Sequence, residues 1–372
     1  MRPAFSSTRS TAAFALLLLV LLALPAVLGQ SWLPPREEAY SRQGWGSGPY
    51  PWIENQIFQE TNAIDIAFIG SSHIFNDINT PYVQARLSAQ LGRPAVVRTI
   101  AWGGAGYDGL YFIARDLLAH RRMRMLVFYD ENPAPGQRNN QTPAWFRFRE
   151  DAGLLAGESW REQGLFYCAA LIGLPRNGLS LLRPNLPAPL VTDQKNYWEI
   201  IADGPNPVTQ LGSLSYRRGF GLKPPADATA FTAFQPQTGA IPKDVEAFSP
   251  AAKNEFEFSA TPLPAWQIHF FRRFAELFRQ HHVQPVMLHL PVLAEAHDPV
   301  IKERADWPQL FGGDLSLLGI SPEKLFGNLT EDQVRLLYGD PVHFNVNGQT
   351  YFTRLITPAL INLYKDEDQP NH

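Results

Sequence analysis

The chain has 372 residues, enough for one large α/β domain with an insertion or for two domains. Its formal net charge of -3 gives no general attraction for nucleic acid, so we expect no nucleic-acid partner. Cys168 is the only cysteine, which excludes an intrachain disulfide and a cysteine-based metal site.

The first part of the chain is basic and then apolar. Arg2 and Arg9 precede an apolar run from Ala12 to Leu28, and Gly29 follows where a signal peptidase would cleave. We therefore expect residues 1–29 to be a signal peptide or an uncleaved signal anchor. The run is shorter than the roughly 20 residues of a comfortable membrane span. Both alternatives place the rest of the chain outside the cytoplasm, periplasmic or secreted, and the second anchors it to the cytoplasmic membrane through residues 12–28.

Short strands and helices alternate after an irregular lead-in over residues 30–62. Apolar runs predict buried strands, and apolar residues at helical spacing predict helices. The strands are expected at Ile64–Ile69, Ala95–Ala101 and Met125–Tyr129, and the helices at Pro81–Leu91 and Tyr107–Ala119. This alternation predicts a three-layer α/β domain over residues 63–372, flavodoxin-like, with a parallel central sheet covered on both faces.

The pattern is interrupted between about residues 133 and 262, where Pro and Gly are frequent. A structureless loop of this length is improbable in a compact domain, so we expect an insertion with structure of its own. The stretch from Leu165 to Leu182 is apolar enough for a buried helix or helix pair. The pattern then resumes with a helix at Ala265–His281, a strand at Pro285–Leu290 and a last helix at Asn347–Tyr364.

Small and polar residues follow the predicted strands directly. Gly70-Ser71-Ser72-His73 follows the first strand, the glycine cluster 103–106 follows the second, and Asn132 lies just after the third. The carboxyl ends of parallel strands line one crevice, so these residues are expected to converge. The segment "GDPVHFNVNG", which contains Asp340 and His343, precedes the last helix and supplies an acid and a histidine three residues apart.

This order of parts resembles the SGNH (GDSL-like) hydrolase superfamily. The resemblance covers roughly residues 63–132 and 265–364 and leaves out the insertion. It implies that Ser72 is the nucleophile, His343 the base and Asp340 the acid, and that the Ser72 and Gly103 backbone N–H groups and the Asn132 side chain form the oxyanion hole. Gly104 or Gly106 could replace Gly103. We expect no cofactor and no metal.

One departure narrows the expected function. Gly70-Ser71-Ser72 stands where the family usually has Gly-Asp-Ser. That form resembles an envelope-associated branch whose members handle acyl groups on cell-surface polymers. The expected function is thus an extracytoplasmic acyl-ester hydrolase or O-acyltransferase acting on a cell-envelope or extracellular glycan. The alternative is a non-catalytic carbohydrate-binding or envelope-assembly protein on the same fold, and the distance from His343 to Ser72 discriminates between them.

The chemistry supports the same residues. A serine hydroxyl is a weak nucleophile until a base takes its proton, and an acid must fix the tautomer of that base. Ser71 remains an alternative nucleophile. His73 is expected either to contact substrate or to cap the following helix, and His289 is a candidate for the surroundings of the site. The histidines show no metal-ligand spacing.

Overall fold

The computed structural model describes residues 7–28, 35–41, 53–101, 106–130, 142–181, 198–202, 214–218, 263–297 and 307–366. These residues divide into two compact units. The first combines Met1–Gln43 with Asn140–Leu186, and the second combines Gly44–Asn139 with Pro187–His372. Two segments that are far apart in the sequence therefore make up the first unit.

The first unit is helical. Its elements are α1 (Thr8–Leu28), α2 (Arg36–Ser41), α7 (Thr142–Trp145), α8 (Phe148–Asp151), the 3-10 helix η3 (Ala152–Leu155) and α9 (Trp160–Leu181). Tyr40 stacks on Trp145 at 5.3 Å between ring centroids, and the Tyr167 hydroxyl donates to the Leu22 carbonyl. Among the helices in the described ranges, none has both the length and the apolar character needed to span a membrane.

The second unit begins with a π-helical turn, η2 (Asn55–Gln59), and a run of alternating strands and helices. These are β1 (Ile64–Gly70), α4 (Ser72–Asp77), α5 (Thr80–Leu91), β2 (Val97–Ala101), α6 (Tyr107–His120) and β3 (Met123–Tyr129). The strands β4 (Trp198–Ala202) and β5 (Leu214–Arg218) then form an antiparallel pair.

The C-terminal part of this unit has more, and shorter, elements. They are α12 (Ala265–His281), β6 (Gln284–Leu288), α13 (Leu293–His297), α14 (Trp307–Phe311), β7 (Ser316–Leu318), α15 (Pro322–Phe326), α16 (Glu331–Arg335), β8 (Tyr338–Asp340), β9 (His343–Phe344) and α17 (Val346–Asp366).

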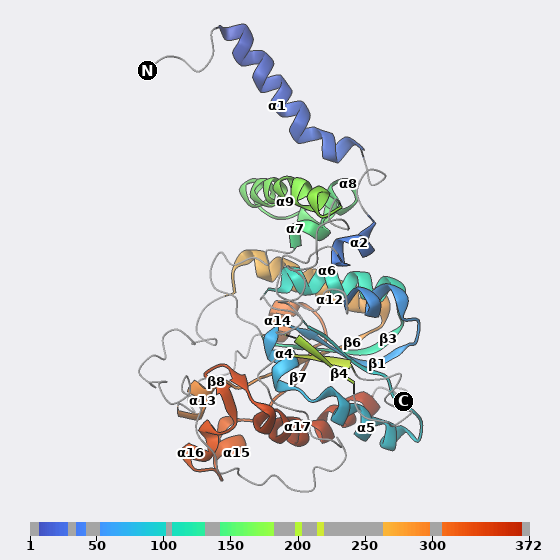
Figure 1. Cartoon of the computed structure of the whole chain (residues 1–372), viewed down its shortest axis with the longest axis vertical. Coiled ribbons are helices and arrows are strands. Elements are labelled where there is room, and N and C mark those ends of the chain that lie inside the picture. Colours follow the sequence, from blue (N-terminus) through green and yellow to red (C-terminus); the bar gives the residue numbers. More distant parts are fainter. Residues whose placement is uncertain are drawn as a thin grey trace. The chain divides into compact units, whose positions relative to one another are not determined.

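The central sheet has five parallel strands in the order β2-β1-β3-β6-β7. Helices α6 and α12 lie on one face, and α5 and α17 lie on the other (Figure 1). The fold is thus α/β with a parallel sheet between helical layers, and it is compatible with a flavodoxin-like fold.

Apolar side chains on both faces of the sheet explain why these helices pack there. On the α12 face, the ring of Phe128 contacts Phe271, Phe274 and Phe278. On the α17 face, Ile66 and Phe68 belong to one buried cluster with residues of α5 and α17. Full burial of one such side chain contributes about 1.5–3 kcal/mol to folding.

Two of the differences from the sequence expectation concern the lead-in and the insertion. The lead-in expected to be irregular contains α2 and η2, because each short segment has a buried side chain to place, Tyr40 in the first and Ile57 in the second. The insertion expected as one piece is divided, since α7 to α9 belong to the helical unit and the β4–β5 pair belongs to the sheet-containing unit. Strand β5 contacts α4 and β2.

Candidate active site

The parallel register brings the carboxyl ends of the central strands to one edge. Gly70 is paired with Ala101, Ile69 with Phe128, and Tyr129 with Leu288. The residues that follow these positions, including Ser71, Asp130 and His289, therefore lie at the same edge of the sheet. The candidate active site is built there, entirely within the second unit.

Gly70 allows the sharp passage from β1 into α4. A Cβ atom at Gly70 would lie 2.5 Å from Ile74 Cγ1 and 3.1 Å from Tyr129 Cδ1, closer than ordinary contacts allow. Ile74 and Tyr129 are both buried, so neither side chain has space to move. The missing side chain thus lets α4 begin directly at the strand end, with Ser72 as its first residue.

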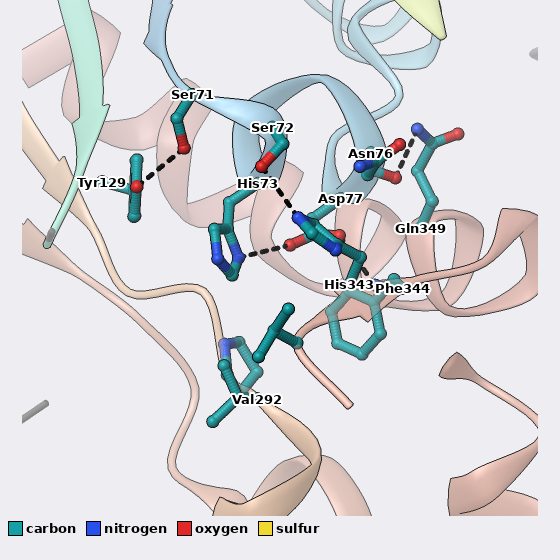
Figure 2. A network of polar contacts seen from close by, with 12 residues as sticks. Ser71, Ser72, His73, Asn76, Asp77, Tyr129, Val292, His343, Phe344 and Gln349 are labelled. Atoms are coloured by element: carbon teal, nitrogen blue, oxygen red, sulfur yellow. Dashed lines mark hydrogen bonds and ion pairs between the residues drawn. The ribbon is translucent and has the colours of Figure 1, made fainter. Parts of the chain in front are cut away.

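Ser72, His343 and Asp340 form a continuous hydrogen-bonded chain. His343 Nε2 lies 2.8 Å from Ser72 Oγ (Figure 2). His343 Nδ1 lies 2.8 Å from Asp340 Oδ2 and 3.0 Å from Asp340 Oδ1. The three residues named from the sequence are therefore brought together in the order expected for a nucleophile, a base and an acid.

The protonation of this chain follows from the state of Asp340. Burial raises the pKa of Asp340, but hydrogen bonding and charge attraction from His343 and the Val342 and His343 N–H groups outweigh it, and the net pKa is lowered. Asp340 is then a carboxylate that accepts from His343 Nδ1–H. The Nε2 lone pair is left to accept the Ser72 hydroxyl proton, as a general base requires.

A tight hairpin explains the short spacing between acid and base. Asp340 ends β8 and His343 begins β9, and the two are paired across the antiparallel turn. Asp340 Oδ1 also accepts the backbone N–H groups of Val342 and His343, both at 2.9 Å. The same carboxylate thus shapes the turn and orients the imidazole.

The residues after His343 fix the start of the last helix. Asn345 Oδ1 accepts the N–H groups of Asn347 and Gly348 at 2.8 and 3.2 Å. Its amide nitrogen donates to the carbonyls of Leu336 and Tyr338. A Cβ at Gly348 would lie 2.2 Å from the Leu337 carbonyl oxygen, so this position has no space for one. The motif thus holds α17 against the β8–β9 hairpin.

Ser71 has a different environment from its neighbour. Its side-chain oxygen lies 2.7 Å from the Tyr129 hydroxyl, and the residue is only 4% exposed. Figure 2 shows this pair on the opposite side of His73 from His343. Ser72, and not Ser71, makes the described hydrogen bond to the base.

His73 lies inside the site and does not cap the helix. Its ring packs against the rings of Tyr129 and His343, with centroids 5.2 and 4.7 Å away. Its Nδ1 lies 3.3 Å from Asp77 Oδ2, one helical turn along α4. Sequence reasoning missed Asp77, although its position four residues after His73 in a helix was a signal.

A second ionic cluster lies at the same edge of the sheet. His289 Nδ1 is 2.6 Å from Asp130 Oδ2, and His289 Nε2 is 2.7 Å from Glu295 Oε2. Burial alone would lower the pKa of His289, but the two carboxylates raise it well above its ordinary value. Nowhere in the described ranges do three or more His, Cys, Asp or Glu side chains form a group suited to a metal ion.

The other oxyanion donors named from the sequence, Gly103 and Asn132, lie outside the described residues. Gly104, an alternative to Gly103, lies outside them as well. Gly106 is described and precedes α6 as its N-cap, with a φ of 127° that favours glycine. A Cβ there would also lie 2.4 Å from Asp108 Oδ1, so Gly106 has a conformational role.

Comparison with known proteins gives no family for this chain. No family model matches it, and no curated protein matches it at a significant level.

Proposed function

We propose that the protein is a serine-dependent acyl-ester hydrolase or O-acyltransferase of the SGNH type. The observation that carries this proposal is the chain Ser72–His343–Asp340, with 2.8 Å between Ser72 Oγ and His343 Nε2. The five-stranded parallel sheet with the site at its carboxyl edge supports the same assignment. This geometry favours an enzyme over a non-catalytic protein on the same fold, because a binding protein needs no such relay.

The first half-reaction acylates the serine. Ser72 Oγ attacks the ester carbonyl carbon while His343 Nε2 takes its proton, and Asp340 stabilises the imidazolium that forms. The tetrahedral intermediate then collapses, the C–O bond to the alcohol breaks, and His343 returns the proton to the leaving oxygen. The acyl group is left as an ester of Ser72.

The second half-reaction removes the acyl group. His343 takes a proton from water in a hydrolase, or from a sugar hydroxyl in a transferase, and the resulting oxygen nucleophile attacks the carbonyl carbon of the acyl-serine. The tetrahedral intermediate collapses, the C–O bond to Ser72 Oγ breaks, and His343 returns the proton to that oxygen. Donors are needed for the oxyanion in both halves, and the expected set is the Ser72 and Gly103 N–H groups and the Asn132 amide. Loss of one such donor typically costs about 2.7–4 kcal/mol of transition-state stabilisation.

The proposed substrate is an acyl ester on a cell-envelope or extracellular glycan. The support is the resemblance of Gly70-Ser71-Ser72 to the envelope-associated branch and the basic and apolar residues 1–29. The proposed location is extracytoplasmic. A reporter enzyme fused after residue 372 tests it, and we expect activity only on the far side of the cytoplasmic membrane. Reporter activity in the cytosol would overturn the location and make an envelope substrate untenable.

The nucleophile is tested with a fluorophosphonate probe and mass spectrometry of the labelled peptide. We expect the probe on Ser72 and complete loss of labelling and esterase turnover in Ser72→Ala. Ser71→Ala is the matched control, because it removes the neighbouring hydroxyl and no contact with His343. We expect it to remain active. Labelling of Ser71, or an active Ser72→Ala protein, would overturn the assignment, and an unlabelled native protein would favour the non-catalytic alternative.

A further inference from the structure

Helix α4 carries a second imidazole–carboxyl pair beside the nucleophile. His73 Nδ1 and Asp77 Oδ2 lie 3.3 Å apart, and neither atom has a hydrogen-bond partner among the described residues. Asp77 is fully buried, and the His73 side chain is 13% exposed. The proposed reaction uses neither residue, so the burial of two ionisable groups at this position needs an explanation.

Asp77 connects the helix of the nucleophile to the strand of the base. Its other oxygen, Oδ1, accepts the backbone N–H of Phe344 at 2.8 Å, and Phe344 directly follows His343 (Figure 2). Gln349 adds a nearby connection, since its amide nitrogen donates to the Asn76 carbonyl at 2.8 Å. The Ser72 and His343 backbones are thus held together by contacts that do not involve the catalytic side chains.

His73 limits the position of the catalytic ring itself. The His73 and His343 rings are tilted by 36° with their centroids 4.7 Å apart, while Tyr129 contacts His73 at 5.2 Å. Burial lowers the pKa of His73, and the charges of Asp340, Asp130 and Glu295 oppose this effect only in part. The resulting pKa is about 4. His73 is therefore uncharged at neutral pH and does not repel His343 when that ring gains a proton.

We propose that His73 and Asp77 are positioning residues for the catalytic base. Asp77 holds the backbone beside His343, and the His73 ring restricts the His343 ring so that Nε2 stays directed at Ser72 Oγ. The catalytic part of this inference rests on the proposed function. The positional part does not, because it concerns the orientation of one ring in the resting protein.

The test uses paired substitutions in the full chain. His73→Phe keeps a ring against His343, whereas His73→Ala removes it. Asp77→Asn keeps an oxygen that accepts from the Phe344 N–H, whereas Asp77→Ala does not. A misplaced catalytic group can cost about 10²-fold in rate, so we expect a fall of about 10²-fold in kcat for each alanine variant with little change in KM. The Phe and Asn variants should retain most of the activity.

Nuclear magnetic resonance of protein that carries isotope-labelled histidine gives a readout that is independent of turnover. We expect a downfield Nδ1–H resonance of His343, hydrogen-bonded to Asp340, in the native, His73→Phe and Asp77→Asn proteins. It should broaden or disappear in both alanine variants. Unchanged kcat and an unchanged resonance in the alanine variants would overturn the proposal. If Asp77→Ala does not fold, the comparison of His73→Ala with His73→Phe tests the proposal.

The pH profile separates positioning from proton transfer. The groups that face His73 are Asp77 of α4, Tyr129 of β3, Asp340 and His343 of the hairpin, and Asp130 and Glu295 near the strand ends. We expect the acid limb of kcat/KM to stay in place in His73→Phe. Loss of that limb would make His73 the base and overturn its positioning role. If the native protein showed no turnover but its His343 Nδ1–H resonance still broadened in His73→Ala, the proposed function would be overturned. The positioning role of His73 would stand.

Discussion

His289 is held between two carboxylates, one on each ring nitrogen. Asp130 follows β3, Glu295 lies in α13, and both contacts are shorter than 2.8 Å. The side chain of His289 is 16% exposed, so water screens these charges poorly. Burial opposes the charged ring, but the carboxylates raise the pKa of His289 well above its ordinary value. The imidazolium therefore joins the ends of β3 and β6 to α13.

Folding stability should depend on pH through this residue. A group whose pKa is raised by folding contributes fully below its unfolded pKa, about 6.5 for histidine, and loses that contribution as pH rises through the folded value. We expect His289→Gln to lower the free energy of unfolding by about 3–5 kcal/mol at pH 6, as for other broken buried ion pairs. The difference from the native protein should shrink above pH 6.5, by at most about 1.4 kcal/mol per pH unit.

Urea unfolding at pH 6 and pH 8.5 measures this difference. His281→Gln is the matched control, because His281 is exposed at the end of α12 and makes no described contact with a carboxylate. Its substitution at an exposed position should change the free energy of unfolding by no more than about 0.5 kcal/mol. A His289→Gln difference that stayed constant or grew with pH would contradict a charged His289.

At the scale of single residues, the sequence was sufficient to name the members of the hydrogen-bonded chain Ser72–His343–Asp340 and to place His289 near them, but not to name the partners of His289 or of Asp77. Ser72, Asp340 and His343 were predicted because each lies in a short motif with a defined place after a strand or before a helix. The partnership of His289 with Asp130 joins residues 159 positions apart. That of Asp77 with the Phe344 N–H joins residues 267 positions apart. A single sequence contains no signal for such pairs.

At the scale of elements, the spacing of apolar residues predicted helices correctly where a helix buries one long face. The helix predicted at Ala265–His281 has those bounds in α12, since its apolar residues line one face against the sheet. The helix predicted at Pro81–Leu91 begins one residue earlier in α5, where Asn79 caps it by accepting the Tyr82 N–H. The longer strands of the sheet were found for a related reason, because most of their residues are apolar and buried; β2 is the exception, since its middle holds Arg98 and Thr99.

Short elements were not predicted, and three of them form the site: α4, β8 and β9. Strands β8 and β9 have three and two residues, too few to show any period. Their hairpin is specified instead by side-chain oxygens that accept backbone N–H groups: Asp340 accepts from its own turn, and Asn345 accepts from the start of α17. Edge strand β7, with three residues, was missed for the same reason.

At the scale of the whole molecule, the order of segments along the chain differs from their grouping in space. Residues 142–181 associate with the N-terminal helices, as the ion pair of Arg36 with Asp151 and the hydrogen bond of Tyr167 to Leu22 illustrate. Strands β4 and β5, which follow in the same predicted insertion, belong to the unit that contains the central sheet. A Pro- and Gly-rich composition predicted an insertion, but it could not reveal this division.

The contact of β5 with α4 gives the second half of the insertion a direct connection to the helix that begins at Ser72, the proposed nucleophile. We therefore expect residues 187–262 to select a bulky acceptor at the crevice. Replacing them with a short Gly-Ser linker should spare hydrolysis of p-nitrophenyl acetate, which needs only the catalytic chain. Activity on a chemically O-acetylated polysaccharide should fall much further, because recognition of a large acceptor needs surface around the site.

The matched replacement of residues 142–181 removes helices that pack with residues 1–43 instead, and should leave the ratio of the two activities unchanged. Circular dichroism establishes that each shortened chain retains its fold before the activities are compared. Equal losses on both esters in a folded 187–262 replacement would mean that this segment supports the site without selecting the acceptor. No loss on either ester would place acceptor selection elsewhere, and the β5–α4 contact would then serve only the packing of the sheet-containing unit.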